Sequence, residues 1–172
     1  MKTFKKTILV LLAVVAVSIT SCSKSDDGGE DPQGGTGTFS AKVDGATFTP
    51  IQETIVAQMS GSGAAQTLAV SAGTMNSENL QMIIVGYDGV GTYDLNMTNI
   101  GTYSYLPNPS NPDPSTVVIY STINGQTSNG QLKVSSVDGN VVKGTFSFTG
   151  YNLSNPSESV SVTDGQFNIE LR

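Results

Sequence analysis

Of the Asp-Gly pairs in this chain, four lie between short runs in which apolar and polar residues alternate. The pairs are Asp44-Gly45, Asp88-Gly89, Asp138-Gly139 and Asp164-Gly165. Asp-Gly in this setting is a strong short-range signal for a β-hairpin, because both residues tolerate the positive φ angles that a tight turn requires. The sequence therefore predicts a fold built from antiparallel strands.

Two of the pairs fit a two-residue hairpin, in which residues equidistant from the turn lie opposite each other and share a face. At Asp44-Gly45 and at Asp164-Gly165 this register makes one face apolar and leaves the other polar. The apolar pairs that it predicts are Val43 with Ala46, Ala41 with Phe48, Val162 with Phe167 and Val160 with Ile169. We therefore expect a hairpin at each of these two sites.

The remaining two pairs need other arrangements. At Asp138-Gly139 a three-residue loop over 137–139, with Gly139 in the left-handed region, keeps the core face apolar by placing Val134 opposite Val142. Around Asp88-Gly89 both faces of the predicted hairpin are apolar, over 80–87 and 90–96. A strand that is apolar on both faces is expected to be central in a sheet or covered by a loop.

The alternation along the whole chain predicts a single all-β domain over residues 38–172. Short strands with turn signals between them are typical of an antiparallel meander that forms a β-sandwich or a partly open β-barrel, here of about 8–11 strands. The predicted strands lie near 38–43, 46–50, 53–60, 66–73, 80–87, 90–96, 117–123, 130–136, 140–149, 159–163 and 166–171.

Residues 104–115 interrupt this pattern, because four of the seven prolines lie there. Proline cannot donate to a sheet ladder, so we expect an exposed loop with polyproline II character. Long loops in compact domains often carry function, although a tolerated surface insertion has the same appearance. The residues predicted as a candidate binding loop are Tyr103, Tyr105, Pro107, Pro109, Pro112 and Pro114.

The composition excludes several kinds of active site. The chain contains no histidine, which excludes Ser-His-Asp and Cys-His catalysis and histidine-based metal sites. We predict no catalytic, cofactor-binding or metal-ligating residue, and no cofactor. A hydrolase that uses two carboxylates stays open as an alternative, because such residues come from distant strands. The acidic residues available for it are Glu53, Glu78, Asp88, Asp94, Glu158 and Glu170.

The six tyrosines offer a second set of candidate residues for a binding face. They are Tyr87, Tyr93, Tyr103, Tyr105, Tyr120 and Tyr151. Most of these positions alternate within predicted strands, and for such residues a half-buried structural role is the simpler expectation.

The amino terminus has the pattern of an export signal. Lys2, Lys5 and Lys6 precede an uncharged apolar stretch over 8–17. That stretch is too short to span a bilayer, which needs roughly twenty apolar residues. The following Ile19-Thr20-Ser21-Cys22 resembles the lipobox of bacterial lipoproteins. The resemblance implies cleavage between Ser21 and Cys22, which makes residues 1–21 the signal peptide, and lipidation of the Cys22 sulfur. A plain secretory signal with an unrelated cysteine and a retained membrane helix are the alternatives.

Residues 22–37 contain many glycines and, at 26, 27, 30 and 31, four carboxylates, so we expect a flexible tether behind the lipidated cysteine. The Ser25-Asp26-Asp27 cluster resembles the surface-export signal of Bacteroidetes lipoproteins, although a solvated acidic linker looks the same. Five basic and fourteen acidic residues follow the predicted cleavage site. An acidic chain of this kind is a poor partner for nucleic acid, because phosphate contacts need clustered lysine and arginine.

Several segments together resemble an uncharacterised family of small Bacteroidetes lipoproteins. They are 39–48 (FSAKVDGATF), 91–95 (GTYDL), 130–138 (GQLKVSSVD), 142–148 (VKGTFSF) and 160–167 (VSVTDGQF). These are turn-and-strand motifs, so the resemblance implies a fold and a lineage, and it brings no activity and no functional residue with it.

Two functions of different classes follow from the sequence. The first is a lipid-anchored, non-catalytic binding or structural lipoprotein of the outer membrane, exposed on the cell surface if the export signal acts. Its partners would be the membrane, through the lipid, and a glycan, a small apolar molecule or another envelope protein. The second is an envelope hydrolase that uses paired carboxylates, such as a glycosidase.

Overall fold

The computed structural model describes residues 35–123 and 127–172. These residues form eleven β-strands and three short 3₁₀-helices, and they contain no α-helix. The strands are β1 (Thr38–Val43), β2 (Ala46–Phe48), β3 (Val56–Ser60), β4 (Thr67–Gly73), β5 (Glu78–Val85), β6 (Gly91–Asp94), β7 (Ile100–Tyr105), β8 (Val118–Ser121), β9 (Gly130–Asp138), β10 (Val141–Asn152) and β11 (Ser159–Glu170). The 3₁₀-helices are η1 (Gln52–Thr54), η2 (Gly63–Ala65) and η3 (Pro114–Thr116). The predicted all-β class is confirmed.

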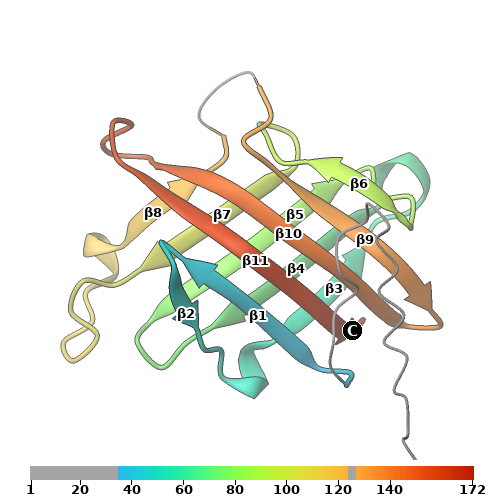
Figure 1. Cartoon of the computed structure of the whole chain (residues 1–172), viewed down its shortest axis with the longest axis horizontal. Coiled ribbons are helices and arrows are strands. Elements are labelled where there is room, and N and C mark those ends of the chain that lie inside the picture. Colours follow the sequence, from blue (N-terminus) through green and yellow to red (C-terminus); the bar gives the residue numbers. More distant parts are fainter. Residues whose placement is uncertain (1–34, 124–126) are drawn as a thin grey trace, which may run out of the picture.

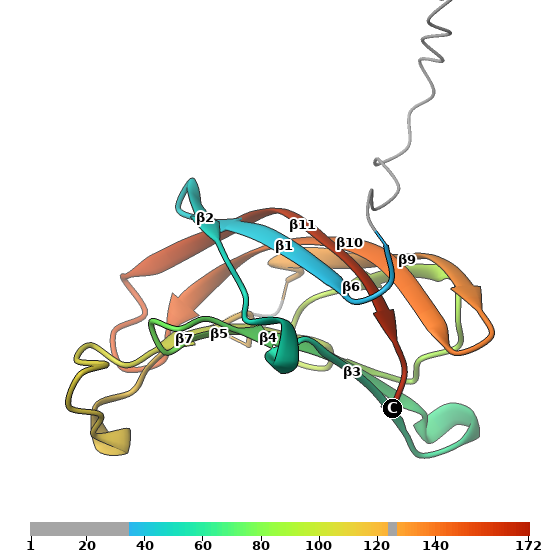
Figure 2. The ribbon, with the colours of Figure 1, turned by 90° about the horizontal axis from the view of Figure 1, so that it is seen from below.

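All eleven strands belong to one antiparallel sheet that curls into a half-barrel (Figure 1). The hydrogen-bonded path runs β2-β1-β11-β10-β8-β7-β5-β4-β3. Outside this path, β9 pairs with β10 and also with β6. Seen from below, the sheet forms two layers, with β1, β11, β10 and β9 above and β7, β5, β4 and β3 underneath (Figure 2). Of the two architectures expected, the structure is the partly open barrel.

The two layers are joined along one side by the end of β10. Its first part pairs with β9, and its last two residues, Tyr151 and Asn152, pair with β8. On the opposite side a single parallel bridge links Ala57 of β3 to Leu171. The sheet is therefore continuous on one side, whereas on the other side a single bridge joins its layers.

The core fills the space between the layers. Strand residues alternate between the two faces of a sheet, and most of the buried positions here are apolar. The buried polar residues are Ser121, Thr122, Asn152 and Asn168. The largest fully buried hydrophobic side chains are Phe167, Leu68, Leu80, Met82, Ile84, Leu95 and Leu132. The interior is thus packed with side chains from both layers.

The Asp44-Gly45 hairpin is confirmed with its predicted register. Val43 pairs with Ala46, and Ala41 pairs with Phe48. Asp44 and Gly45 have φ angles of 48° and 81°, as a tight two-residue turn requires.

The predicted hairpin at Asp164-Gly165 is wrong, because both residues lie inside the single long strand β11. On β10, Phe146 pairs with Gly165 and Phe148 pairs with Val162, so β11 carries one extra residue at this point. The pairing with β1 shifts at the same place, between Ser40 and Lys42. This is a β-bulge, with Asp164 in the left-handed region at a φ of 52°.

A hairpin does form at Asp138-Gly139, and Gly139 has the predicted positive φ, here 59°. The predicted register is wrong, because Val134 pairs with Gly144 and not with Val142. The extra residue lies in the strand, as a bulge at Ser135, and not in the loop. The turn itself keeps only two residues between Asp138 and Val141.

The predicted hairpin at Asp88-Gly89 is also wrong. Strand β5 pairs with β4 and β7, whereas β6 pairs with β9 in the other layer. The segment between β5 and β6 therefore crosses from one layer to the other, and Gly86 and Gly89 have φ angles of 71° and 111° along it. The expected central position of the strand before this turn is confirmed, but its outer face is not buried, since Val85 is 46% exposed.

Strand β7 was not predicted, and it contains two residues that we assigned to the candidate binding loop, Tyr103 and Tyr105. The proline-rich segment begins directly after it, and its four prolines are exposed as expected. Strand β7 lies between β5 and β8, so its tyrosines belong to the sheet.

Candidate functional site

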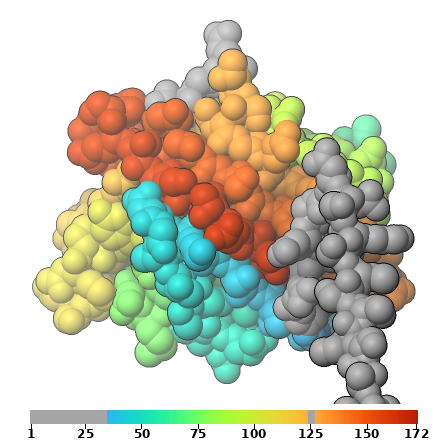
Figure 3. Space-filling model, viewed as in Figure 1, coloured from blue at the N-terminus to red at the C-terminus, as the bar shows by residue number. Residues whose placement is uncertain are grey.

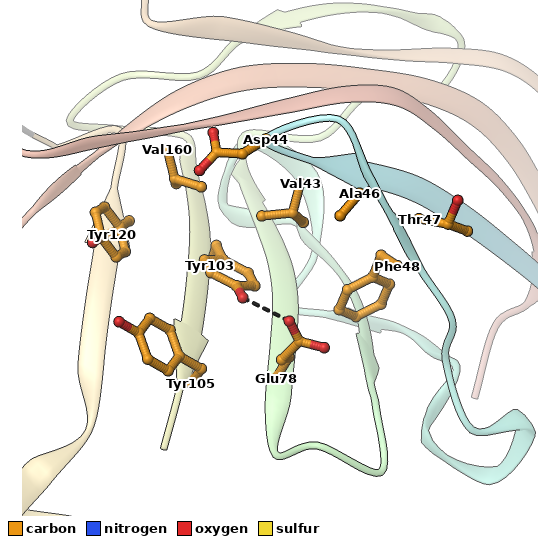
Figure 4. A pocket seen from close by; sticks show the side chains of 10 residues that line it. All are labelled: Val43, Asp44, Ala46, Thr47, Phe48, Glu78, Tyr103, Tyr105, Tyr120 and Val160. Carbon is orange, nitrogen blue, oxygen red and sulfur yellow. Dashed lines mark hydrogen bonds between the residues drawn. The ribbon is translucent and has the colours of Figure 1, made fainter. Parts of the chain in front are cut away.

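A cleft lies at one open end of the half-barrel, between the β1–β2 hairpin and strands β5, β7 and β8 (Figure 4). It consists of two cavities, of about 260 and 340 Å³, that share Glu78, Tyr103 and Tyr105. We call this pair of cavities the tyrosine cleft. The first cavity is completed by Val43, Asp44, Ala46, Thr47, Phe48, Tyr120 and Val160, and the second by Asn76, Leu106, Pro107 and Pro109.

Strand pairing brings the polar side chains of the cleft together. Tyr103 and Tyr105 are two residues apart on β7 and therefore point to the same face. Their partners across the sheet are Tyr120 on β8, opposite Tyr103, and Glu78 on β5, opposite Tyr105. The ring centroid of Tyr103 lies 5.9 Å from that of Tyr105 and 6.3 Å from that of Tyr120.

The carboxylate of Glu78 is held by two hydroxyl groups. Tyr103 Oη donates to Glu78 Oε1 at 2.8 Å, and Thr74 Oγ1 donates to Oε2 at 3.0 Å. Burial raises the pKa of the Tyr103 phenol, and the hydrogen bond to Glu78 and the charge of Glu78 raise it further. The phenol therefore stays protonated and acts as a donor to the carboxylate.

A second carboxylate reaches the first cavity from the other layer. Asp44 occupies the turn between β1 and β2, and its Oδ1 accepts a hydrogen bond of 2.8 Å from the backbone N–H of Ser161. No lysine or arginine lines either cavity of the cleft. The salt bridge found within the described ranges joins Lys42 to Asp164 at 2.9 Å, away from the cleft. Both cleft carboxylates therefore lack a cationic partner among the described residues.

The residues of the candidate binding loop separate into two groups. Tyr103, Tyr105, Pro107 and Pro109 line the second cavity of the cleft. Pro112 and Pro114 do not line it, and Pro114 begins η3, which Asp113 caps through its side chain. The predicted lipidation and cleavage residues, Ser21 and Cys22, lie outside the described residues.

The sequence alone does not show how Glu78, Tyr120 and Asp44 join the site. Glu78 and Tyr120 were noted only among the acidic residues and the tyrosines, because strand β7, which pairs with β5 and β8, was not predicted. Asp44 was interpreted as a turn residue alone. Of the carboxylates considered for a hydrolase, Glu78 lines the cleft and Glu170 lines a separate cavity near the C-terminus.

A larger cavity, of about 600 Å³, lies against the outer face of β6, β9, β10 and β11, where β11 bulges. Its lining is mainly hydroxyl and amide side chains, with Lys133 and Asp164. Figure 3 views the molecule from this side, where β1, β11 and β10 lie next to one another. Within residues 35–123 and 127–172, no group of three or more histidine, cysteine, aspartate or glutamate residues is placed to hold a metal ion.

A protein-family model described as "Domain of unknown function (DUF6252)" matches residues 35–169. The chain belongs to the DUF6252 family. The DUF6252 match contains every residue of the tyrosine cleft and extends from before β1 to the penultimate residue of β11. The expectation that the chain belongs to an uncharacterised family is confirmed by this match. No curated protein and no solved structure matches the chain.

In the part of the chain that the structure describes, no helix has the length and apolar character needed to cross a membrane.

Proposed function

We propose that this DUF6252 protein is a lipid-anchored lipoprotein of the cell envelope whose β-domain binds a ligand, without catalysis, in the tyrosine cleft. The observation that carries the binding role is the cleft itself. It combines three tyrosine rings, two carboxylates and apolar walls at an open end of an otherwise packed domain. A concave site with a few convergent polar groups is the usual form of a ligand site.

The anchoring role is supported by the amino-terminal sequence. The stretch that resembles a lipobox ends at Cys22, the only cysteine of the chain. A thiolate is a suitable nucleophile for forming the thioether to a diacylglyceryl group. Several acyl chains on one residue would give stable anchoring, which a single chain does not. The acidic cluster behind Cys22 supports a position in the outer membrane, facing the medium.

The hydrogen bonds of the cleft support the binding role. Both oxygens of Glu78 accept hydrogen bonds from neighbouring hydroxyl groups, and one oxygen of Asp44 accepts from the backbone N–H of Ser161. These bonds fix the two carboxylates in place. A few polar groups held in fixed positions beside apolar walls are suited to orienting a ligand.

One observation favours the hydrolase as a second candidate. Asp44 and Glu78 line the same cavity, and paired carboxylates in a cleft are the machinery of glycosidases. Chromogenic glycosides offered to the wild type and to Glu78→Gln test this candidate. Hydrolysis that Glu78→Gln abolishes would support the enzyme and contradict our proposal.

The anchoring part is tested by the mass of the mature protein extracted from membranes with detergent, beside a Cys22→Ala variant. We expect residues 22–172 plus acyl chains in the outer-membrane fraction, and loss of the acyl mass in the variant. An unacylated mature protein in the soluble fraction would contradict the lipoprotein assignment.

The binding part is tested by screening a library of small ligands against the full-length protein in non-ionic detergent, with thermal unfolding as the readout. Hits should lose their effect in Tyr105→Ser and keep it in Tyr151→Ser, a matched change of a half-buried tyrosine outside the cleft. A library in which no ligand shows this dependence on Tyr105 would contradict a binding role for the cleft.

A further inference from the structure

Two tyrosine rings in the cleft are placed to receive a ligand. Tyr105 and Tyr120 are half-buried and line the first cavity, whereas Tyr103, at 7% exposure, packs between them. The ring of Tyr103 lies 5.9 Å from Tyr105 and 6.3 Å from Tyr120, so the three rings form one aromatic wall. The face of an aromatic ring carries negative potential and attracts a cation within about 6 Å.

The charges around this wall have a single sign. Glu78 and Asp44 both line the first cavity, and the side chains that complete either cavity include no lysine or arginine. The donors that hold the two carboxylates are neutral hydroxyl and amide groups, so the negative charges stay uncompensated within the described residues. Such a cleft favours a cation and repels an anion.

The rest of the lining favours an organic cation over a bare metal ion. Ca²⁺ and Mg²⁺ need several oxygen ligands, and no group of three or more histidine, cysteine, aspartate or glutamate residues is placed to hold a metal ion in residues 35–123 and 127–172. The cavities have apolar walls instead, with Phe48 and Val160 in one and Leu106 and Pro107 in the other. These walls suit the hydrocarbon part of an organic molecule.

We infer that the tyrosine cleft binds an organic ammonium group, with the aromatic wall and the two carboxylates around the cation and the apolar walls around its alkyl substituents. This inference rests on the proposed binding function and names its ligand class. An ammonium group can come from a free amine or from a phospholipid headgroup. Because both carboxylates would repel a headgroup phosphate, a free quaternary or alkyl ammonium fits better.

Isothermal titration calorimetry of the full-length protein in non-ionic detergent tests the inference with three probes. Choline carries the cation, and 3,3-dimethyl-1-butanol has the same shape with carbon in place of the charged nitrogen. Glycerophosphocholine adds the phosphate of a lipid headgroup. We expect choline to bind about tenfold more tightly than either of the others, and its affinity to fall as salt is raised.

Variants connect this binding to the cleft. Tyr105→Leu, which removes a ring, and Glu78→Gln, which removes a charge, should each weaken choline binding about tenfold. Tyr105→Phe keeps the ring face and should bind choline as the wild type does. Asp44→Asn removes the second charge, but asparagine tolerates the left-handed turn, so this variant tests the charge without disturbing the fold. Equal urea midpoints would establish that each variant is folded.

The outcomes separate this inference from the proposed function. Equal binding of choline and its neutral analogue, lost in Tyr105→Leu, would keep the binding function and overturn the ammonium assignment. Preference for glycerophosphocholine would overturn the assignment to a free amine. Absence of choline binding overturns the inference, and the proposed function falls with it only if the library screen also yields no ligand that depends on Tyr105.

Discussion

The bulge in β11 makes a strong prediction, because the same substitution can be made at an Asp-Gly pair that forms a hairpin. Gly165→Ala would place a Cβ 2.5 and 2.6 Å from two ring carbons of Phe146, and against the carbonyl oxygen of that residue. Carbon atoms in contact normally lie about 3.5–4.0 Å apart, so each ring contact is about 1 Å too close. The ring cannot swing away, since it is 4% exposed and packs 5.2 Å from the ring of Phe39.

We therefore expect Gly165→Ala to lower the free energy of unfolding by about 3 kcal/mol, the upper end for overpacking a core. Gly45→Ala is the matched control, because Gly45 has a φ of 81° and its added Cβ would meet nothing within 4 Å. Its cost is that of a side chain in the left-handed region, about 1 kcal/mol.

Urea unfolding followed by circular dichroism measures both changes. With a denaturant slope of about 2 kcal/mol per molar urea, the midpoint should fall by about 1.5 M for Gly165→Ala and by about 0.5 M for Gly45→Ala. If Asp164-Gly165 were the tip of a hairpin, Gly165 would occupy the same kind of turn as Gly45. Equal losses in the two variants would therefore refute the bulge and the register of β11.

Three further predictions concern other polar groups of the sheet. Thr122 is fully buried and its Oγ1 accepts a hydrogen bond from the backbone N–H of Gly101 at 3.0 Å, so Thr122→Val should cost about 2 kcal/mol in urea unfolding, and Thr122→Ser much less. Burial, together with the hydrogen bond to Asp88, raises the pKa of Tyr93 to about 12. Since the folded-state pKa exceeds the unfolded value, the contribution of Tyr93 to stability is full below about pH 10 and is lost as the pH rises toward 12. Urea midpoints over this range should fall less steeply for Tyr93→Phe, and a parallel fall would contradict the assignment. Asp164 has a φ of 52°, so Asp164→Val should cost about 1–2 kcal/mol more than Asp164→Asn by the same measurement, and equal stability of the two would count against the left-handed conformation.

The sequence predicted the class of fold correctly, but it could not distinguish a hairpin from a bulge. In β11 the buried positions change from even numbers, at Val160 and Val162, to odd numbers, at Phe167 and Ile169. A two-residue turn and a one-residue bulge both produce this change of parity. The ambiguity is resolved only by the partners on both sides, β1 and β10, and the sequence does not identify them. The hairpin at Asp44-Gly45 was correct because its partner strand is adjacent in the chain.

The candidate site was only partly predictable for the same reason. The tyrosines of β7 and two nearby prolines were singled out through the proline-rich segment, although they were assigned to a loop. Glu78 meets Tyr105 because β5 skips β6 and pairs with β7. That pairing is possible because β6 pairs with β9 in the other layer. It therefore depends on the arrangement of the whole sheet and not on a local sequence pattern.

The aromatic residues of the core and those of the cleft have different partners. Phenylalanine rings fill space that glycines leave on facing or neighbouring strands, and an added Cβ at each glycine would meet the ring. The pairs are Gly101 with Phe148, Gly144 with Phe167 and Gly165 with Phe146. In the cleft, three tyrosines join Phe48 in the lining, and the Tyr103 hydroxyl donates a hydrogen bond to Glu78. A half-buried carboxylate is tolerated only when donors satisfy it, so Tyr103 lets the domain keep a negative charge beside an apolar core. A cleft that binds an organic ammonium group needs this combination of charge and apolar surface.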